Sequence, residues 1–316
     1  MERQMGVRGL ADAVIEERPV GQLDRIGSLI DWSKLAAIVK DIHGSEKGRP
    51  SYPSLMLVKA LLLAQWYRLS DPDLEEALSD RMSFRRFVGL AMADPTPDHV
   101  TLWRFRDELV KHKRHEQLLK EVERQFTERK LIVKQGTLID ATLLDAQAAK
   151  PGRPIGARSR VDPDADWTRQ YGRSTFGYKA HLAVDLDALL IRKAVLTSAK
   201  VYESQVADEL IGWDEGAVYA DKAYEHKERR AKLKAQGITD HIMHRNHKYQ
   251  SELPDWQKAH NAAIAPVRRR VEHIFGTLKR CYGYTRVRYF NLERNAVQLT
   301  LMAMALNLRR GLVLVQ

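Results

Sequence analysis

The sequence predicts a mixed α/β protein, with a central mixed sheet flanked by helices and an all-α domain before it. Residues 31–130 place apolar side chains at helical spacing and contain few β-rich runs. Residues 131–220 then read as a strand, a strand pair, a helix and a further strand, which fits a mixed sheet rather than an alternating βαβ array. A chain of 316 residues with 44% hydrophobic content suggests about two domains. We place them at residues 1–130 and 131–316.

Composition indicates the kind of partner and the cellular compartment that suit this chain. The chain has 52 Lys and Arg residues against 41 Asp and Glu, a net charge of +11 and a pI near 9.6, which favours a polyanionic partner such as nucleic acid. The one cysteine, Cys281, excludes an internal disulfide and a Cys-rich zinc site, and it favours a reducing cytoplasm. The N-terminus lacks the apolar region of a secretory signal. The longest apolar run, residues 55–66, is broken by Lys59 and is too short to cross a bilayer, so we expect no membrane partner.

The N-terminal domain is predicted from helical periodicity and from caps. Residues 1–30 indicate an arm or a short helix. Further helices are predicted at residues 32–42, 53–69, 71–78, 81–90, 100–110 and 116–129. The segment 101–106 mixes basic and aromatic residues, so Arg104 and Arg106 are candidate phosphate contacts, and residues 80–110 allow a helix-turn-helix. The alternative is a packed helix whose arginines form a solvated rim.

The second half opens with a carboxylate after an apolar strand. Residues 131–139 are β-rich and mostly apolar, and Asp140 follows them. A buried unpaired carboxylate is costly, so such residues are normally paired, hydrogen-bonded or bound to a metal. Capping of a turn is the alternative. A second short apolar run, residues 217–220, also ends on an aspartate, Asp221.

A loop, a strand pair and a helix are predicted between the two aspartates. Residues 146–173 are rich in Pro, Gly, Arg and Asp, which is typical of a long functional loop that closes over a ligand. On the strand that follows, Lys179 and His181 share one face. Strands are predicted at residues 176–184 and 189–196, and a helix at residues 201–211.

A third carboxylate lies on a helix predicted over residues 267–281, which Pro266 starts. At 3.6 residues per turn, the stripe that must face the sheet contains Val267, Val271, Ile274, Phe275 and Leu278. The rim of that stripe carries Arg268, Glu272 and Lys279, whereas the residues that point away are Arg269, Arg270, His273 and Arg280. Glu272 can therefore reach the edge of the sheet where the aspartates lie. The alternative is a surface Arg–Glu pair worth a few tenths of a kcal/mol.

Three such carboxylates suit two divalent metal ions about 3.5–4 Å apart. Hard Mg²⁺ prefers carboxylates, water and phosphate oxygens. One ion can activate an attacking water or 3′-hydroxyl and the other can stabilise the leaving oxygen, while basic residues hold the phosphodiester.

Three further stretches bear on partners and packing. The basic stretch 227–248 favours phosphate contacts or a solvated face over zinc, because its histidines lack the spacing of a closed site. Residues 282–289 interleave basic and aromatic side chains in a manner compatible with a DNA strand. Residues 291–311 predict a final amphipathic helix.

These motifs together resemble the bacterial insertion-sequence DDE transposases, in the large family named after insertion sequence five. The landmarks, in order, are Tyr52-Pro-Ser-Leu-Met-Leu-Val-Lys-Ala60, Asp98-His-Val-Thr-Leu-Trp-Arg-Phe-Arg106, Asp140-Ala-Thr142, Phe176-Gly-Tyr-Lys-Ala-His181 and Tyr219-Ala-Asp-Lys-Ala-Tyr224. The family signature Tyr-x2-Arg-x3-Glu-x6-Lys is matched by Arg268, Glu272 and Lys279, with Ala265 in the tyrosine position. That departure affects an accessory contact and leaves the three acids intact.

The resemblance implies an RNase H-like catalytic domain with Asp140, Asp221 and Glu272 as ligands of two Mg²⁺ ions, for which Mn²⁺ can substitute. The implied DNA-binding residues are Arg268, Lys279, Lys179 and His181, to which we add Arg269, Arg104 and Arg106 as candidates. The activity would be metal-dependent cleavage at element ends and 3′-hydroxyl strand transfer. Its partners would be double-stranded DNA, as terminal inverted repeats and target, and a second copy in a homodimer or larger assembly.

The expected location is the bacterial cytoplasm, in association with the nucleoid. Two alternatives stay open at this point. One is a nuclease of the same fold without strand transfer, and the other is a decayed or domesticated DNA-binding protein without catalysis. The presence of all three acids argues against decay.

Overall fold

The computed structural model describes residues 9, 20–42, 50–151, 159–170, 172–246 and 252–315. The chain divides into two compact units, residues 1–126 with 300–316, and residues 127–299. Most of the N-terminal arm, part of the loop in 146–173, and His247 and Lys248 of the basic stretch lie outside the described residues. No helix among the described residues is long and apolar enough to cross a membrane.

The first unit is a helical assembly around α4 (Ser54–Tyr67), whose Leu57, Leu61 and Leu62 have no exposed surface. Trp66 at the end of α4 donates from Nε1 to the Ala305 carbonyl at 2.7 Å. This bond ties the last part of α13 (Leu292–Leu314) into the helical unit. The other helices of this unit are α2 (Gln22–Leu29), α3 (Trp32–Val39), α5 (Asp71–Asp80), α6 (Met82–Val88), α7 (His99–Lys111) and α8 (Arg114–Glu128).

Two predictions for helices need correction. The connection between α6 and α7, residues 89–98, is longer than the three- or four-residue turn of a helix-turn-helix, so the segment 80–110 does not have that geometry. The final helix is not amphipathic, because every residue from 297 to 308 is buried. A helix buried all round needs apolar or satisfied side chains on every face.

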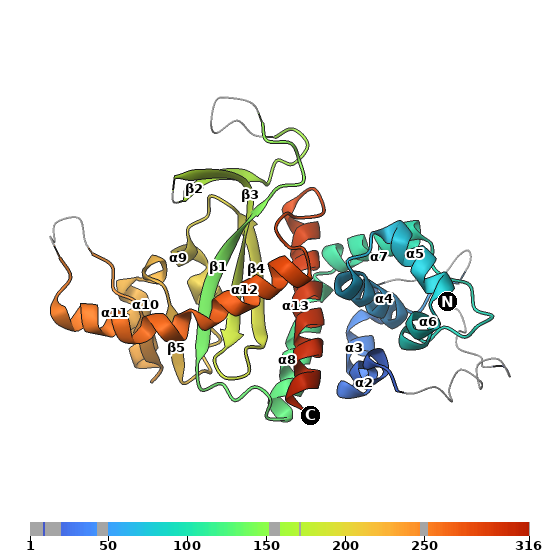
Figure 1. Cartoon of the computed structure of the whole chain (residues 1–316), viewed down its shortest axis with the longest axis horizontal. Coiled ribbons are helices and arrows are strands. Elements are labelled where there is room, and N and C mark those ends of the chain that lie inside the picture. Colours follow the sequence, from blue (N-terminus) through green and yellow to red (C-terminus); the bar gives the residue numbers. More distant parts are fainter. Residues whose placement is uncertain are drawn as a thin grey trace. The chain divides into compact units, whose positions relative to one another are not determined.

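The second unit is a mixed sheet (Figure 1). Three strands, β1 (Thr137–Asp145), β3 (Arg173–Asp185) and β4 (Ile191–Ser198), pair antiparallel as neighbours. On the other side of β1, β5 (Ala217–Ala220) and then β6 (Thr239–Ile242) continue the sheet in parallel. A short strand, β2 (Asp166–Gln170), forms a hairpin with the start of β3. The predicted α/β class and mixed sheet are confirmed.

Helices cover both faces of this sheet. Ile139 of β1 packs in one cluster with α9 (Glu203–Leu210), the 3-10 turn η1 (Lys222–Tyr224) and α10 (Lys227–Ala235). Asp140 points to the other face, because strand side chains alternate. On that face it contacts the end of α11 (Asp255–Arg268), and α12 (Arg270–Cys281) runs in front of β1 (Figure 1).

The strands differ from their predicted bounds in three places. Strand β1 does not end at Asp140 but continues to Asp145, because β3 pairs with it along the whole length. The predicted loop 146–173 contains β2, whose polar residues form a strand through backbone pairing with β3. Strand β6 lies inside the basic stretch 227–248 and is completed by parallel pairing with β5.

The acidic helix also begins elsewhere. Helix α11 runs through Pro266, which was predicted to start a helix, and α12 begins at Arg270 after a break at Arg269. Proline lacks the N–H that would bond to the preceding turn, and the chain tolerates this loss where Ala262 and Pro266 are exposed. Four members of the predicted stripe are buried, Val271, Ile274, Phe275 and Leu278, while Val267 is only half-buried.

Candidate active site

The two aspartates of the candidate site are placed by strand register. Parallel pairing of β1 with β5 ends at Ile139 opposite Ala220. Asp140 and Asp221 are the next residues on each strand, so they follow the same point of the sheet. Asp221 leaves the strand there and accepts a hydrogen bond from the Lys222 N–H at 2.6 Å, which caps η1.

The third carboxylate is connected to the first by an arginine. Arg268 donates from Nη1 to Asp140 Oδ2 at 2.9 Å, and its Nη2 lies 3.5 Å from Glu272 Oε1. The side chains of Asp140 and Arg268 are each 19% exposed, whereas that of Glu272 is 58% exposed. The wheel relation between residues 268 and 272 therefore survives the break at Arg269. Arg268 therefore contacts one largely buried carboxylate, that of Asp140, and one exposed carboxylate, that of Glu272.

Asp140 has a raised pKa, to about 6. Burial is the main cause, because it disfavours the charged form. The negative charges of Asp221 and Glu272 raise the pKa as well, while the Ala141 N–H and Arg268 oppose the shift. Each of the other two acids thus lies close enough to act on Asp140.

The donor chemistry of the three acids fits a hard divalent cation, since Mg²⁺ prefers carboxylate oxygens. No three His, Cys, Asp or Glu side chains in the described ranges form a ready-made metal group. Arg268 instead contributes the positive charge between Asp140 and Glu272. The site therefore consists of carboxylate oxygen atoms around the guanidinium group of Arg268.

Lys179 and His181 lie on the other face of the sheet. Asp140 is registered opposite Leu182, and Ile139 opposite Ala183, so the odd-numbered residues of β3 face the cluster under α9. Lys179 forms an ion pair with Glu203 at 2.9 Å and donates to the Val201 carbonyl. The structure does not bring these two side chains to Asp140.

His181 has no exposed surface, and its Nε2 lies 2.9 Å from the Thr197 hydroxyl. Burial, together with the charge of Lys179, lowers its pKa to about 3. A neutral imidazole in this position supports the sheet from within.

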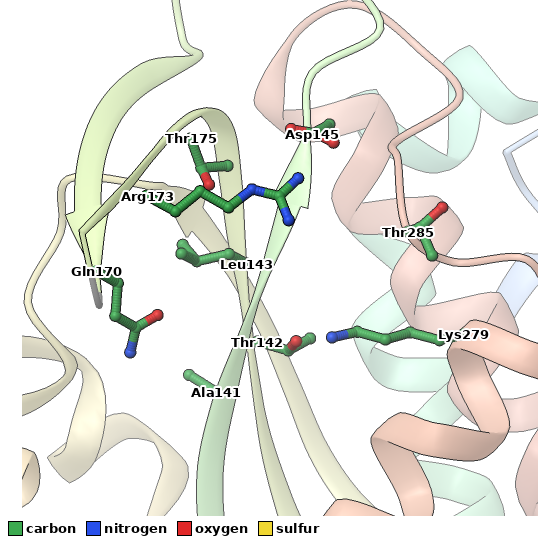
Figure 2. A pocket seen from close by; sticks show the side chains of 9 residues that line it. All are labelled: Ala141, Thr142, Leu143, Asp145, Gln170, Arg173, Thr175, Lys279 and Thr285. Carbon is green, nitrogen blue, oxygen red and sulfur yellow. The ribbon is translucent and has the colours of Figure 1, made fainter.

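Lys279 lines a cleft of about 600 Å³ whose lining along β1 begins at Ala141, the residue after Asp140. Figure 2 shows its ammonium reaching toward Thr142, while Arg173 extends into the cleft from β3. The cleft is lined by Ala141, Thr142, Leu143, Asp145, Gln170, Arg173, Thr175, Lys279 and Thr285. Sequence reasoning missed Gln170, Arg173 and Thr175 because it assigned the first two to a loop and gave Thr175 no role.

The remaining basic candidates differ in exposure. Arg269 and Arg104 are exposed. Arg106 is only 3% exposed and donates from both terminal nitrogens to Asp71, at 3.0 and 2.7 Å. Its guanidinium is therefore held inside the helical unit, and the structure does not present it to a partner.

Comparisons with known proteins identify the family of the two parts of the chain. Residues 132–308 match a family described as the transposase DDE domain, and residues 12–108 match a transposase domain (DUF772). The first match begins before Asp140 and includes Asp221 and Glu272.

Three solved structures show low-level similarity. The piggyBac transposase, in a synaptic complex with hairpin DNA, is 12% identical with a TM-score of 0.40, over 90% of this chain and 71% of that chain. A pre-cleavage Mos1 transpososome is 9% identical with a TM-score of 0.20, over 86% and 82%. A Mos1 mariner paired end complex with Mn is 10% identical with a TM-score of 0.19, over 89% and 92%.

The family assignment rests on the DDE-domain match, which spans more than half of the 316 residues. The mixed sheet β2-β3-β1-β5-β6 with its flanking helices is the RNase H-like fold of such transposases. The chain belongs to the DDE transposase family.

Proposed function

We propose that this chain is an active insertion-sequence transposase of the insertion-sequence-five type. It cleaves phosphodiester bonds at the ends of its element and joins the freed 3′-hydroxyl to target DNA. The observation that carries the proposal is the β1–β5 register, which sets Asp140 beside Asp221, together with the Arg268 link from Asp140 to Glu272.

Asp140, Asp221 and Glu272 would hold two Mg²⁺ ions, with Mn²⁺ as a substitute. Bound divalent ions lower the pKa of an attacking water or hydroxyl and stabilise the leaving oxygen. Support comes from the donor set, since all three groups are carboxylates, and from the negative charges of Asp221 and Glu272, which act on Asp140 and add to the effect of burial in raising its pKa. One Mos1 structure in the same broad class was determined with Mn.

The basic residues around the acids would position the DNA. A guanidinium can donate two parallel hydrogen bonds to a phosphate, and Arg268 stands between two of the proposed ligands. Lys279 supplies a point charge in the adjoining cleft. The net charge of +11 favours DNA approach over the whole surface. Two element ends must be held together, so we propose that the chain acts as a homodimer or larger assembly on DNA.

The decisive test is cleavage of labelled terminal-repeat DNA in the presence of Mg²⁺. We expect wild-type protein to yield nicked ends and joined products, and Asp140→Asn to yield neither, because it removes a charged oxygen donor. Glu209→Gln, an exposed acid on α9, is the matched control and should cleave as wild type does. Undiminished cleavage by Asp140→Asn would contradict the site assignment. Cleavage without joined products would identify a nuclease, and DNA binding without metal-dependent cutting would identify a non-catalytic protein.

A further inference from the structure

We propose that the cleft beside Asp140 binds the sugar–phosphate backbone of a single DNA strand, with Arg173 and Lys279 as its two phosphate contacts. The proposal rests on the proposed function, because it takes the strand to continue from a phosphate held at Asp140. Arg173 is the new element: it lies in a segment that the sequence assigns to a loop, and it does not belong to the acidic helix.

The position of the cleft follows from the sheet. Strand β1 loses its parallel neighbour after Ile139, because β5 ends at Ala220. Beyond that point this side of β1 is bordered by the cleft, until the segment after α12 pairs with Asp145. Ala141, the residue after Asp140, is the first lining residue along β1. Thr142, whose side chain lies on the same face of β1 as that of Asp140, also lines the cleft, so a strand with its reacting phosphate at Asp140 would continue into it.

Two cations face this space without an ion-pair partner among the described residues. Arg173 and Lys279 are both exposed, and neither has an ion pair or side-chain hydrogen bond with any of the described residues. Figure 2 shows them reaching into the cleft from opposite sides, Arg173 from β3 and Lys279 from α12. Arg268 nearby is instead bonded to Asp140. The two cleft cations are thus available to an anionic ligand.

The rest of the lining indicates which anion fits. Its hydroxyl and amide groups come from Thr142, Thr175, Thr285 and Gln170, and such groups commonly contact phosphate and sugar oxygens. Among the residues that the structure describes, no aromatic ring lines the cleft, so these residues offer none of the base stacking that many single-strand sites use. We therefore expect contacts to the backbone that do not depend on base sequence.

Size restricts the ligand to one strand. A volume of about 600 Å³ lies within the range of sites for small molecules. A duplex, whose major groove alone is about 12 Å wide, does not enter such a space, whereas a few units of one backbone do.

Replacement of Asp145 tests the proposal through an increase in DNA affinity, the opposite of the effect expected for Arg173 and Lys279. This carboxylate ends β1 and belongs to the same lining, and it forms no ion pair with Arg173 or Lys279. Figure 2 places it at one end of the cleft, toward the tip of the Arg173 side chain. A carboxylate repels a bound phosphate, so its neutralisation should strengthen binding.

The experiment measures DNA affinity in the uncut state, in an Asp140→Asn background. The probe is a labelled short duplex that carries an oligothymidine overhang of about ten nucleotides, with the blunt duplex as reference. Arg173→Gln should weaken overhang binding about tenfold, as expected for a lost charge-assisted hydrogen bond. It should also lower the slope of log affinity against log salt by about 0.7, the value for one phosphate of a single strand. Lys279→Gln should act in the same way.

Three variants control for structural damage. Arg169→Gln removes an exposed arginine from the same hairpin, next to Gln170 but outside the cleft lining, and should leave affinity unchanged. Arg173→Lys keeps the charge and should restore most of the affinity. Asp145→Asn should tighten overhang binding severalfold, an effect that misfolding does not produce.

The outcomes separate this inference from the proposed function. Unchanged affinity and salt slope in both Arg173→Gln and Lys279→Gln would overturn the inference, even if wild-type protein cuts and joins DNA. An effect that changes when the overhang is not thymidine would also overturn it, since it would indicate base contacts. Weakened overhang binding by Arg173→Gln supports the inference, even if wild-type protein proves unable to cleave.

Discussion

The arginines of the helical unit and the cations of the cleft are in opposite situations. Arg106 lies inside its unit and has both terminal nitrogens on Asp71. Arg85 is also buried and donates to backbone carbonyls, including that of Asp94 at 2.7 Å. Arg173 and Lys279, in the second unit, project into a cleft with no protein partner among the described residues. The same residue type is thus structural in one place and available to a ligand in the other.

The difference shows that the presence or absence of a protein counter-charge, rather than basic composition, decides whether a cation is available to a ligand. A buried guanidinium must have its hydrogen-bond donors satisfied by the chain itself, so it is not available to DNA. An exposed cation near a carboxylate site contributes little to the stability of the fold, so it is available to bind an external anion. Arg268 lies between these cases, because its partners are the proposed metal ligands.

The largest expected effect comes from removing the buried arginine. Arg106→Gln should lower the free energy of unfolding by about 3 kcal/mol or more, because it leaves Asp71 without its partner in a partly buried pair. Urea denaturation followed by circular dichroism measures the change. Arg104→Gln, on the exposed side of the same helix, is the control and should stay within about 0.5 kcal/mol of wild type. If both variants are equally stable, Arg106 is not a structural residue.

His181, a buried titratable group of the second unit, should make the stability of the protein depend on pH. The folded protein binds a proton on this residue only below about pH 3, whereas the unfolded chain does so below 6.5. Stability is therefore fully present above 6.5 and decreases as the pH falls toward 3. Between about pH 7.5 and about pH 5, wild type should lose about 2 kcal/mol through this one group. His181→Gln should lose correspondingly less in urea titrations at the two pH values.

Thr197→Val is the control for that measurement. It removes the hydroxyl that lies 2.9 Å from His181 Nε2 but keeps the imidazole. Its stability should drop at both pH values, while its pH dependence should follow that of wild type. A His181→Gln variant with unchanged pH dependence would show that another group is responsible.

The sequence was informative where local pattern and chemistry coincide. An apolar run before Asp140, a second before Asp221 and the four-residue spacing of Arg268 and Glu272 were each readable without a structure. The register that sets the two aspartates side by side was not readable, because it depends on pairing between residues about 80 positions apart in the chain, a non-local contact that carries no local signal.

The cleft could not be predicted for a similar reason. Strand β2 has the composition of a loop and becomes a strand only by pairing with β3, as β-propensity depends strongly on context. Arg173 and Gln170 therefore had no assigned face. The prediction from Pro266 was wrong for a different reason. Proline often starts a helix, but Pro266 lies inside α11, where the helix tolerates a missing hydrogen bond.

Arg106 and Arg173 show the limit for single residues. Both are arginines near aromatic or polar residues, and nothing in the adjacent sequence distinguishes the one that pairs with Asp71 from the one that faces a cleft. Only the tertiary partner separates them.

The smallest expected effect concerns Arg268, which is paired within the protein, as Arg106 is, but lies at the proposed metal site. Its guanidinium lies between Asp140 and Glu272, so it competes by charge with any cation that these acids bind. Arg268→Gln should tighten Mn²⁺ binding by about three- to tenfold, a modest change because Glu272 is exposed and water screens its charge. Titration with electron paramagnetic resonance detection measures it without catalysis. Lys279→Gln, whose ammonium has no carboxylate partner among the described residues, should leave Mn²⁺ affinity unchanged. If Arg268→Gln instead weakens Mn²⁺ binding, the arginine organises the ligands, and it then belongs with Arg106 as a structural residue rather than with the cleft cations.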